Sequence, residues 1–196
     1  MRASQCKVVL IESEIQAPEV SMNDKLRSKG IEVVYRAQTL DGILERVCSI
    51  SPDVLILSLP SLGDTTLRSL TAINQLCPIP ILVIAQHHVP DSFEPIVAAG
   101  ISSYIVDDVA AERLPLIIEL AIERFQQMRD LYLELDATKE KLSERKLIEQ
   151  AKGILMQQKQ LSEADAYAQM RTLAMNQGKT MKDLSTQILS VVELFE

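Results

Sequence analysis

With 196 residues, the chain is long enough for one large domain or two small ones, and its composition, 47% hydrophobic and 24% charged, is typical of a soluble globular protein. No apolar run reaches the ~18–20 residues that a membrane-spanning helix requires, and acids interrupt the first apolar run too early for a signal peptide. We therefore expect a cytoplasmic protein.

The net charge of −7 is distributed unevenly. Residues 137–196 contain nine Lys or Arg and eight Asp or Glu, whereas residues 1–136 contain eleven and nineteen, so the two parts carry +1 and −8. An acidic front part repels phosphate, and any contact with nucleic acid has to come from the rear part.

The three cysteines, Cys6, Cys48 and Cys77, are far apart in the chain and lack the spacing of metal ligands. This pattern predicts buried free thiols in a reducing compartment. Nothing in the sequence predicts a bound metal or cofactor.

Short apolar runs alternate with amphipathic stretches over residues 1–124. The runs have the length and the β-branched composition of strands buried on both faces: residues 8–11, 32–35, 54–59, 81–85 and 103–106. Gly30 and Gly100 stand where helices would end. Five such units predict a doubly wound α/β domain of the flavodoxin-like class, with a five-stranded parallel sheet whose functional groups lie beyond the carboxyl ends of the strands.

After Pro115 the pattern indicates one long helix with a heptad repeat. Two positions recur every seven residues, offset by four: Leu114, Ala121, Met128, Leu135 and Leu142, and Ile118, Phe125, Tyr132, Lys139 and Lys146. We expect this helix to pack on the sheet as far as Phe125 and to continue as a coiled-coil linker, residues 125–142, that joins two chains. The predicted seam comprises Phe125, Met128, Tyr132, Leu135 and Leu142, and the pattern does not distinguish parallel from antiparallel pairing.

Residues 143–196 predict an all-α three-helix bundle, because three apolar stripes of helical spacing need one another for burial. Ser162 with Asp165 and Thr180 with Asp183 have the spacing of helix N-terminal caps, and Gly178 stands between the helices as a stop. The stripes are Ile148, Ala151 and Leu155; Tyr167, Met170 and Ala174; and Leu184, Ile188, Val191 and Phe195.

The front part, about residues 6–124, resembles the receiver domain of two-component response regulators. The resemblance rests on PDVLILS at 52–58, IPILVIAQ at 79–86 and AAGISSYIV at 98–106. It implies a phosphorylation pocket made of an acidic pair, a phosphate-accepting Asp, a Thr or Ser, a Lys and a switch aromatic residue. In this chain those positions are held by Glu12 and Ser13, Ser58, Ala85, Asp107 and Tyr104.

These substitutions remove the chemistry that the resemblance would imply. An acyl phosphate needs a carboxylate, which Ser58 lacks, and a hard cation needs carboxylate oxygens at close quarters, of which Ser13 supplies none. Asp107 adds negative charge where the family has a Lys. We therefore expect a pseudo-receiver domain whose state is controlled by a bound partner protein and not by phosphorylation.

A serine nucleophile at Ser58 is the enzymatic alternative, and the sequence disfavours it. Catalysis would need a base within reach, but the only histidines are His87 and His88, and no G-x-S-x-G turn surrounds the serine. We expect no enzymatic activity.

The rear part, residues 144–189, resembles the ANTAR domain of AmiR- and NasT-type transcription antiterminators. The strings RKLIEQAKGILM and AYAQMRTLAM carry the resemblance, and the order receiver, coiled coil, ANTAR is also that of the family. The resemblance is closer to NasT, a nitrate/nitrite assimilation regulator. It implies binding to tandem stem-loops in an mRNA leader, and control by a ligand-sensing protein that sequesters the regulator.

Basic residues of the rear part are the candidate RNA contacts. Arg145, Lys152 and Lys159 are seven apart and form one stripe on a helix. Lys and Arg neutralise phosphates, and side chains read unpaired loop bases. The full predicted set is Arg145, Lys146, Lys152, Lys159, Arg171, Lys179 and Lys182.

Two alternatives to RNA binding are a DNA-binding response regulator and a protein-interaction adaptor. Helix-turn-helix spacing is absent from the rear sequence, and a charge of +1 is small for duplex binding. In the adaptor hypothesis the basic stripe is an ordinary solvated helix face. The predicted domains are residues 1–124, 125–142 and 143–196.

Overall fold

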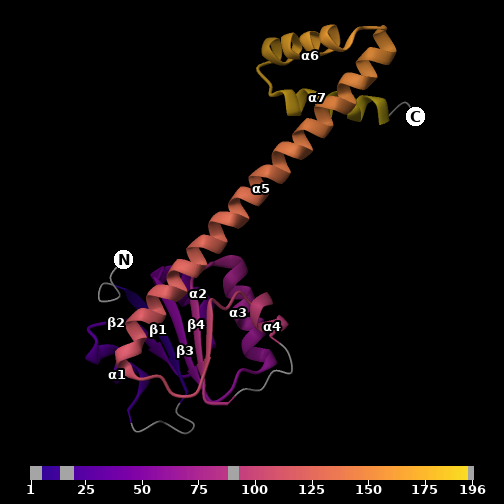
Figure 1. The fold of residues 1–196 in the computed structure, drawn as a ribbon. Coiled ribbons are helices and arrows are strands. Elements are labelled where there is room, and N and C mark those ends of the chain that lie inside the picture. Colours follow the sequence, from indigo (N-terminus) through magenta and orange to yellow (C-terminus); the bar gives the residue numbers. More distant parts are fainter. Residues whose placement is uncertain (1–5, 14–19, 88–92, 194–196) are drawn as a thin grey trace. The chain divides into compact units, whose positions relative to one another are not determined.

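The computed structural model describes residues 6–13, 20–87 and 93–193. The front part is built on five parallel strands in the order β2-β1-β3-β4-β5 (Figure 1). The strands are β1 Lys7–Glu12, β2 Glu32–Ala37, β3 Val54–Leu59, β4 Ile81–Ala85 and β5 Ser103–Val106. The sequence prediction of a five-stranded parallel α/β sheet is confirmed.

Helices cover both faces of this sheet. They are α1 Met22–Ser28, α2 Ile43–Ile50, α3 Asp64–Leu76, α4 Glu94–Ala98, a 3-10 turn at Ala111–Arg113, and the beginning of α5 Leu114–Lys159. Successive strand residues enter different cores: Val8 packs with α1 and α5, whereas Val9 packs with α2, α3 and α4. Burial on both faces explains why the strands are continuously apolar in sequence.

Glycines end the helices where the sequence predicted. Gly30 and Gly100 have φ of +72° and +74°, a conformation that residues with a Cβ rarely adopt. At Gly100 a Cβ atom would also lie 2.2 Å from the side chain of Asn74.

Helix α5 has two differently buried halves. Leu114, Ile118 and Ile122 are buried against the sheet, and Phe125 is half-buried. Every residue from 126 to 143 is exposed. The chain divides into two compact units between Arg129 and Asp130, within this helix, and the predicted domain limits stay predictions.

The rear unit contains the end of α5, α6 Glu163–Gln177 and α7 Met181–Glu193, and these three helices share one apolar core, as predicted. The core residues are Ala151, Leu155, Ala166, Met170, Ala174 and Leu184. Among the described residues, no helix has the length and apolar character that a membrane span requires.

The helix boundaries in the rear unit follow the predicted signals. Ser162 Oγ accepts a hydrogen bond from the backbone N–H of Asp165 at 3.2 Å, and Thr180 Oγ1 accepts one from that of Asp183 at 3.1 Å. Gly178 ends α6 with φ +63°. Two predicted core residues are wrong, because Tyr167 is 45% exposed and Val191 52%; Phe195 lies outside the described residues.

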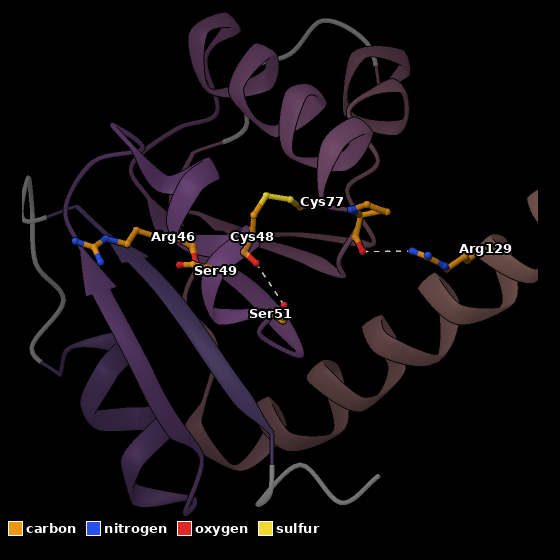
Figure 2. The surroundings of a disulfide bond; sticks show 7 residues. Arg46, Cys48, Ser49, Ser51, Cys77 and Arg129 are labelled. Carbon is orange, nitrogen blue, oxygen red and sulfur yellow. Dashed lines mark hydrogen bonds between the residues drawn. A yellow bond between two sulfur atoms is a disulfide. The ribbon is translucent and has the colours of Figure 1, made fainter.

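The prediction of three free thiols is also wrong. Cys48 and Cys77 form a disulfide with their Cα atoms 5.7 Å apart (Figure 2). Cys48 lies in α2 and Cys77 caps α3, and both helices cover the same face of the sheet. Cys6 is a buried free thiol as predicted, and burial together with nearby Asp53 raises its pKa to about 11.

We predict that Cys48→Ser lowers the free energy of unfolding by about 3–4 kcal/mol in oxidising buffer. The two cysteines are 29 residues apart in sequence. A crosslink that closes a loop of that length lowers the conformational entropy of the unfolded chain, which stabilises the folded state by about this free energy. Cys77→Ser should cause the same loss, and the double variant no further loss. Chemical denaturation should show wild type and variants coinciding once dithiothreitol is added; a difference that persists under reduction would contradict the disulfide.

Candidate functional site

Five of the six positions of the pseudo-receiver pocket, all except Tyr104, meet at one edge of the sheet. Glu12 on β1 lies opposite Ser58 on β3, and the backbone N–H of Ser13 donates to the Ser58 carbonyl at 3.1 Å. The backbone N–H of Asp107 donates to the carbonyl of Ala85 on β4 at 2.9 Å. Parallel strands bring their carboxyl ends together, and these five residues therefore lie at the same edge. Tyr104 lies further back in β5, opposite Val83 of β4.

The Glu12 carboxylate is engaged within the protein. Its side chain is buried, one oxygen accepts a hydrogen bond from the backbone N–H of Met22, and the other pairs with Arg36 at 2.9 Å. A buried carboxylate requires such partners. Within residues 6–13, 20–87 and 93–193, no cluster of three or more His, Cys, Asp or Glu residues could hold a metal ion.

A second ion pair follows β5, where sequence reasoning did not expect one. Lys25 of α1 contacts Asp108 and donates to the carbonyl of Val109 at 3.2 Å, and its side chain is 10% exposed. The partners are 83 residues apart in sequence, so no local pattern could have paired them.

The remaining groups at the sheet edge do not supply phosphoryl-transfer chemistry. Ser58 offers a hydroxyl and Ala85 a methyl group, and Asp107 is exposed. The Tyr104 ring packs against the core beneath α2, α3 and α4, and burial raises the pKa of its hydroxyl. His87 is exposed, and His88 lies outside the described residues.

We predict that beryllofluoride with magnesium leaves the oligomeric state and spectrum of the protein unchanged. Ser58 cannot form the acyl adduct that the reagent mimics, and Glu12 is engaged with Arg36. Size-exclusion chromatography and intact-mass measurement after acetyl phosphate treatment test this, with an intact receiver domain run in parallel. A stable adduct at Glu12 or Ser58 would contradict our interpretation.

In the rear unit the seven candidate cations fall into two groups. Arg145, Lys146 and Arg171 are exposed, and in the described part of the chain no ion pair or side-chain hydrogen bond involves them. The other four have partners within the unit. Lys159 donates to Gln169 at 3.3 Å, Lys179 to Gln187 at 3.0 Å and Lys182 to Glu140 at 3.0 Å, and Lys152 pairs with Glu149 and Glu163.

Lys152 is the most enclosed of the seven. Its side chain is 9% exposed, and its Nζ lies 2.6 Å from Glu149 and 2.7 Å from Glu163. Hydrogen bonds to these two carboxylates raise the pKa of Lys152, and the bond to Lys152 lowers the pKa of Glu163. Since Glu163 opens α6, this pair joins α5 to the beginning of α6.

Lys182 of α7 donates a hydrogen bond to Glu140 of α5, and this bond raises the pKa of Lys182. The Lys182 cation is therefore paired within the rear unit. At Gly153, within α5, a Cβ atom would meet nothing within 4 Å. No described helix therefore requires glycine there.

We predict that Lys152→Gln lowers the thermal stability of the rear unit at neutral pH, because Glu149 and Glu163 lose their shared cation. Glu163 contributes stability above its ordinary pKa of 4.5, and this stability is lost as pH falls through the lowered pKa. Lys152 contributes below its ordinary pKa of 10.5, and this is lost as pH rises through the raised pKa. The difference in melting temperature between wild type and Lys152→Gln should therefore be largest at pH values between the lowered pKa of Glu163 and the raised pKa of Lys152.

Circular dichroism melts across pH measure that difference. Lys146→Gln is the matched control, since Lys146 lies in the same helix and has no described partner. Equal melting temperatures for wild type and Lys152→Gln at neutral pH would contradict the joining role of Lys152.

The chain is similar to known proteins along most of its length. Residues 136–189 match the model of the ANTAR domain. The chain is 28% identical over 186 residues to the transcriptional regulatory protein PdtaR of Mycobacterium tuberculosis, covering 94% of this chain and 90% of that protein. It is also 29% identical over 89 residues to the nitrate regulatory protein of Klebsiella oxytoca, covering 45% of this chain and 22% of that protein.

Solved structures similar to the front unit show its fold. The signal receiver domain of a modulated diguanylate cyclase from Desulfovibrio desulfuricans G20 superposes with a TM-score of 0.54 at 19% identity, over 63% of this chain and 98% of that one. The N-terminal domain of a response regulator/sensory box/GGDEF protein from Carboxydothermus hydrogenoformans superposes with a TM-score of 0.50 at 22% identity, over 62% and 97%. The front unit has a receiver fold.

Proposed function

We propose that this chain, a regulator that joins a receiver-like domain to an ANTAR domain, binds stem-loops in mRNA leaders and acts as a transcription antiterminator. The observation that carries the proposal is the ANTAR match, which covers the second half of α5, all of α6 and most of α7. Favouring one leader hairpin over a competing terminator would let polymerase continue.

The distribution of free cations supports RNA as the ligand. Arg145, Lys146 and Arg171 are exposed without internal partners, so they can neutralise phosphates at no cost in broken ion pairs. Lys152 and Lys182 would first have to leave carboxylates. We therefore assign the phosphate contacts to the first three residues, and give Lys159 and Lys179, held only by neutral amides, a secondary part.

A dimer through α5 fits the paired stem-loops of such leaders. Met128, Tyr132, Leu135 and Leu142 are 55%, 66%, 49% and 54% exposed, although they repeat with coiled-coil spacing. Phe125 is half-buried on the front unit and marks the beginning of the free seam. Two chains would present two ANTAR domains, one for each hairpin.

We also propose that a partner protein controls the regulator, and the charge pairs of the front unit support this. Its Glu12 carboxylate is committed to Arg36, and Ser58 replaces the phosphate acceptor. We propose a cytoplasmic regulator that a ligand-sensing protein sequesters. The similarity to a nitrate regulatory protein makes nitrate and nitrite assimilation the first process to test.

We predict that the full-length protein binds an RNA holding the two adjacent stem-loops of the leader next to its gene, with an affinity that falls steeply as salt rises. Arg145→Gln and Arg171→Gln should each weaken binding. Each should also reduce the slope of log binding constant against log salt concentration (the salt slope) by about 0.7–0.9, the contribution of one phosphate contact. Arg68→Gln is the matched control, because Arg68 is an exposed cation of the front unit. Filter binding or fluorescence anisotropy across salt measures both effects.

Each alternative function has its own result in that assay. Equal affinity for a hairpin with scrambled loops would contradict specific leader recognition. Tighter binding to duplex promoter DNA would favour a DNA-binding response regulator, and no binding to any leader would favour a protein-interaction adaptor.

A further inference from the structure

Helix α6, which is labelled in Figure 1, carries an exposed aromatic residue and an exposed arginine one turn apart. Tyr167 is 45% exposed, and Arg171, four residues on, is exposed as well. Residues four apart lie on one side of a helix. The inner side of α6 is occupied by Ala166, Met170 and Ala174, which form the core.

Most side chains around these two residues are uncharged. The exception is Glu163, four residues before Tyr167, which pairs with Lys152. Ala164, Ala168 and Met175 lie on the same side of α6 by helical spacing, and all three are exposed. The two acids of α6 are committed elsewhere, Glu163 to Lys152 and Asp165 to the Ser162 cap. Along this strip, therefore, the one carboxylate of α6, that of Glu163, is already paired with a cation.

Tyr167 and Arg171 also have no partner among the described residues, since no hydrogen bond, ion pair or ring contact involves them. Burial of a large aromatic ring is favourable. The ring nevertheless stays half in solvent beside an unpaired cation. Unpaired RNA bases are recognised by such a combination, in which an aromatic ring stacks on the base and a cation holds the backbone.

We propose that Tyr167 stacks on one unpaired base of the leader stem-loop while Arg171 contacts the adjoining phosphate. This rests on the proposed RNA-binding function and deepens it, because it assigns base contact to α6 and to a residue that the sequence pattern places in the core. RNA is the occupant that matches both groups, because it offers an unpaired base to the ring of Tyr167 and a phosphate to Arg171.

The test uses full-length protein and the same two-hairpin RNA, with each loop base replaced in turn by 2-aminopurine or by an abasic site. Tyr167→Ala should weaken binding roughly 10- to 100-fold at unchanged salt slope, as the loss of one stacked base does. Tyr167→Phe, which keeps the ring, should bind as wild type. One 2-aminopurine position should be quenched by wild type and Tyr167→Phe but not by Tyr167→Ala, and the abasic RNA at that position should not distinguish the three proteins.

Leu173→Ala is the matched control, because Leu173 is 39% exposed on another side of α6; it should bind RNA as wild type. Circular dichroism verifies that each variant is folded. If wild type binds and Tyr167→Ala binds equally well, the stacking inference is wrong and the proposed function stands. If wild type binds no leader RNA, both are wrong. If Tyr167→Ala changes the sedimentation of the free protein and not its RNA affinity, the strip is a contact between copies of the chain and the inference is again wrong.

Discussion

The structure depends on one helix whose two ends belong to different cores. Leu114, Ile118 and Ile122 of α5 are buried on the sheet, and Ala151 and Leu155 of the same helix are buried in the rear unit. Most helical stability in water comes from packing an apolar face. Residues 126–143 of α5 are all exposed and include regularly spaced apolar side chains. This stretch is the part of the molecule whose burial a second chain would complete.

The front unit keeps the receiver fold while its charges satisfy one another. Arg36 neutralises Glu12, and Lys25 neutralises Asp108, at the edge where a phosphorylated receiver gathers its catalytic groups. In each pair one partner is buried, Glu12 or Lys25, and removing its exposed partner, Arg36 or Asp108, would leave a buried charge without compensation. The carboxylate of Glu12 and the ammonium group of Lys25 are therefore both occupied by partners within the front unit.

In the rear unit, tertiary contacts divide one set of cations into two roles. Lys152 and Lys182 neutralise carboxylates and connect the helices. Arg145, Lys146 and Arg171 are exposed and have no partner among the described residues. The distinction is physical, because a paired cation has to lose one partner before it gains another, whereas a solvated cation exchanges only water and counterions. A small net charge of the rear part is therefore compatible with a basic RNA surface.

The sequence by itself determined the elements whose signals are local. Alternating apolar runs specified five buried strands, Gly30, Gly100 and Gly178 marked helix ends, and Ser162 and Thr180 marked helix beginnings. These signals depend on neighbours within one or two turns. Only the tertiary structure paired Cys48 with Cys77 and Lys25 with Asp108, and only it left Tyr167 exposed where helical spacing had placed it in the core. Such outcomes depend on which distant segments share a face, and the periodicity of a single helix or strand does not contain that information.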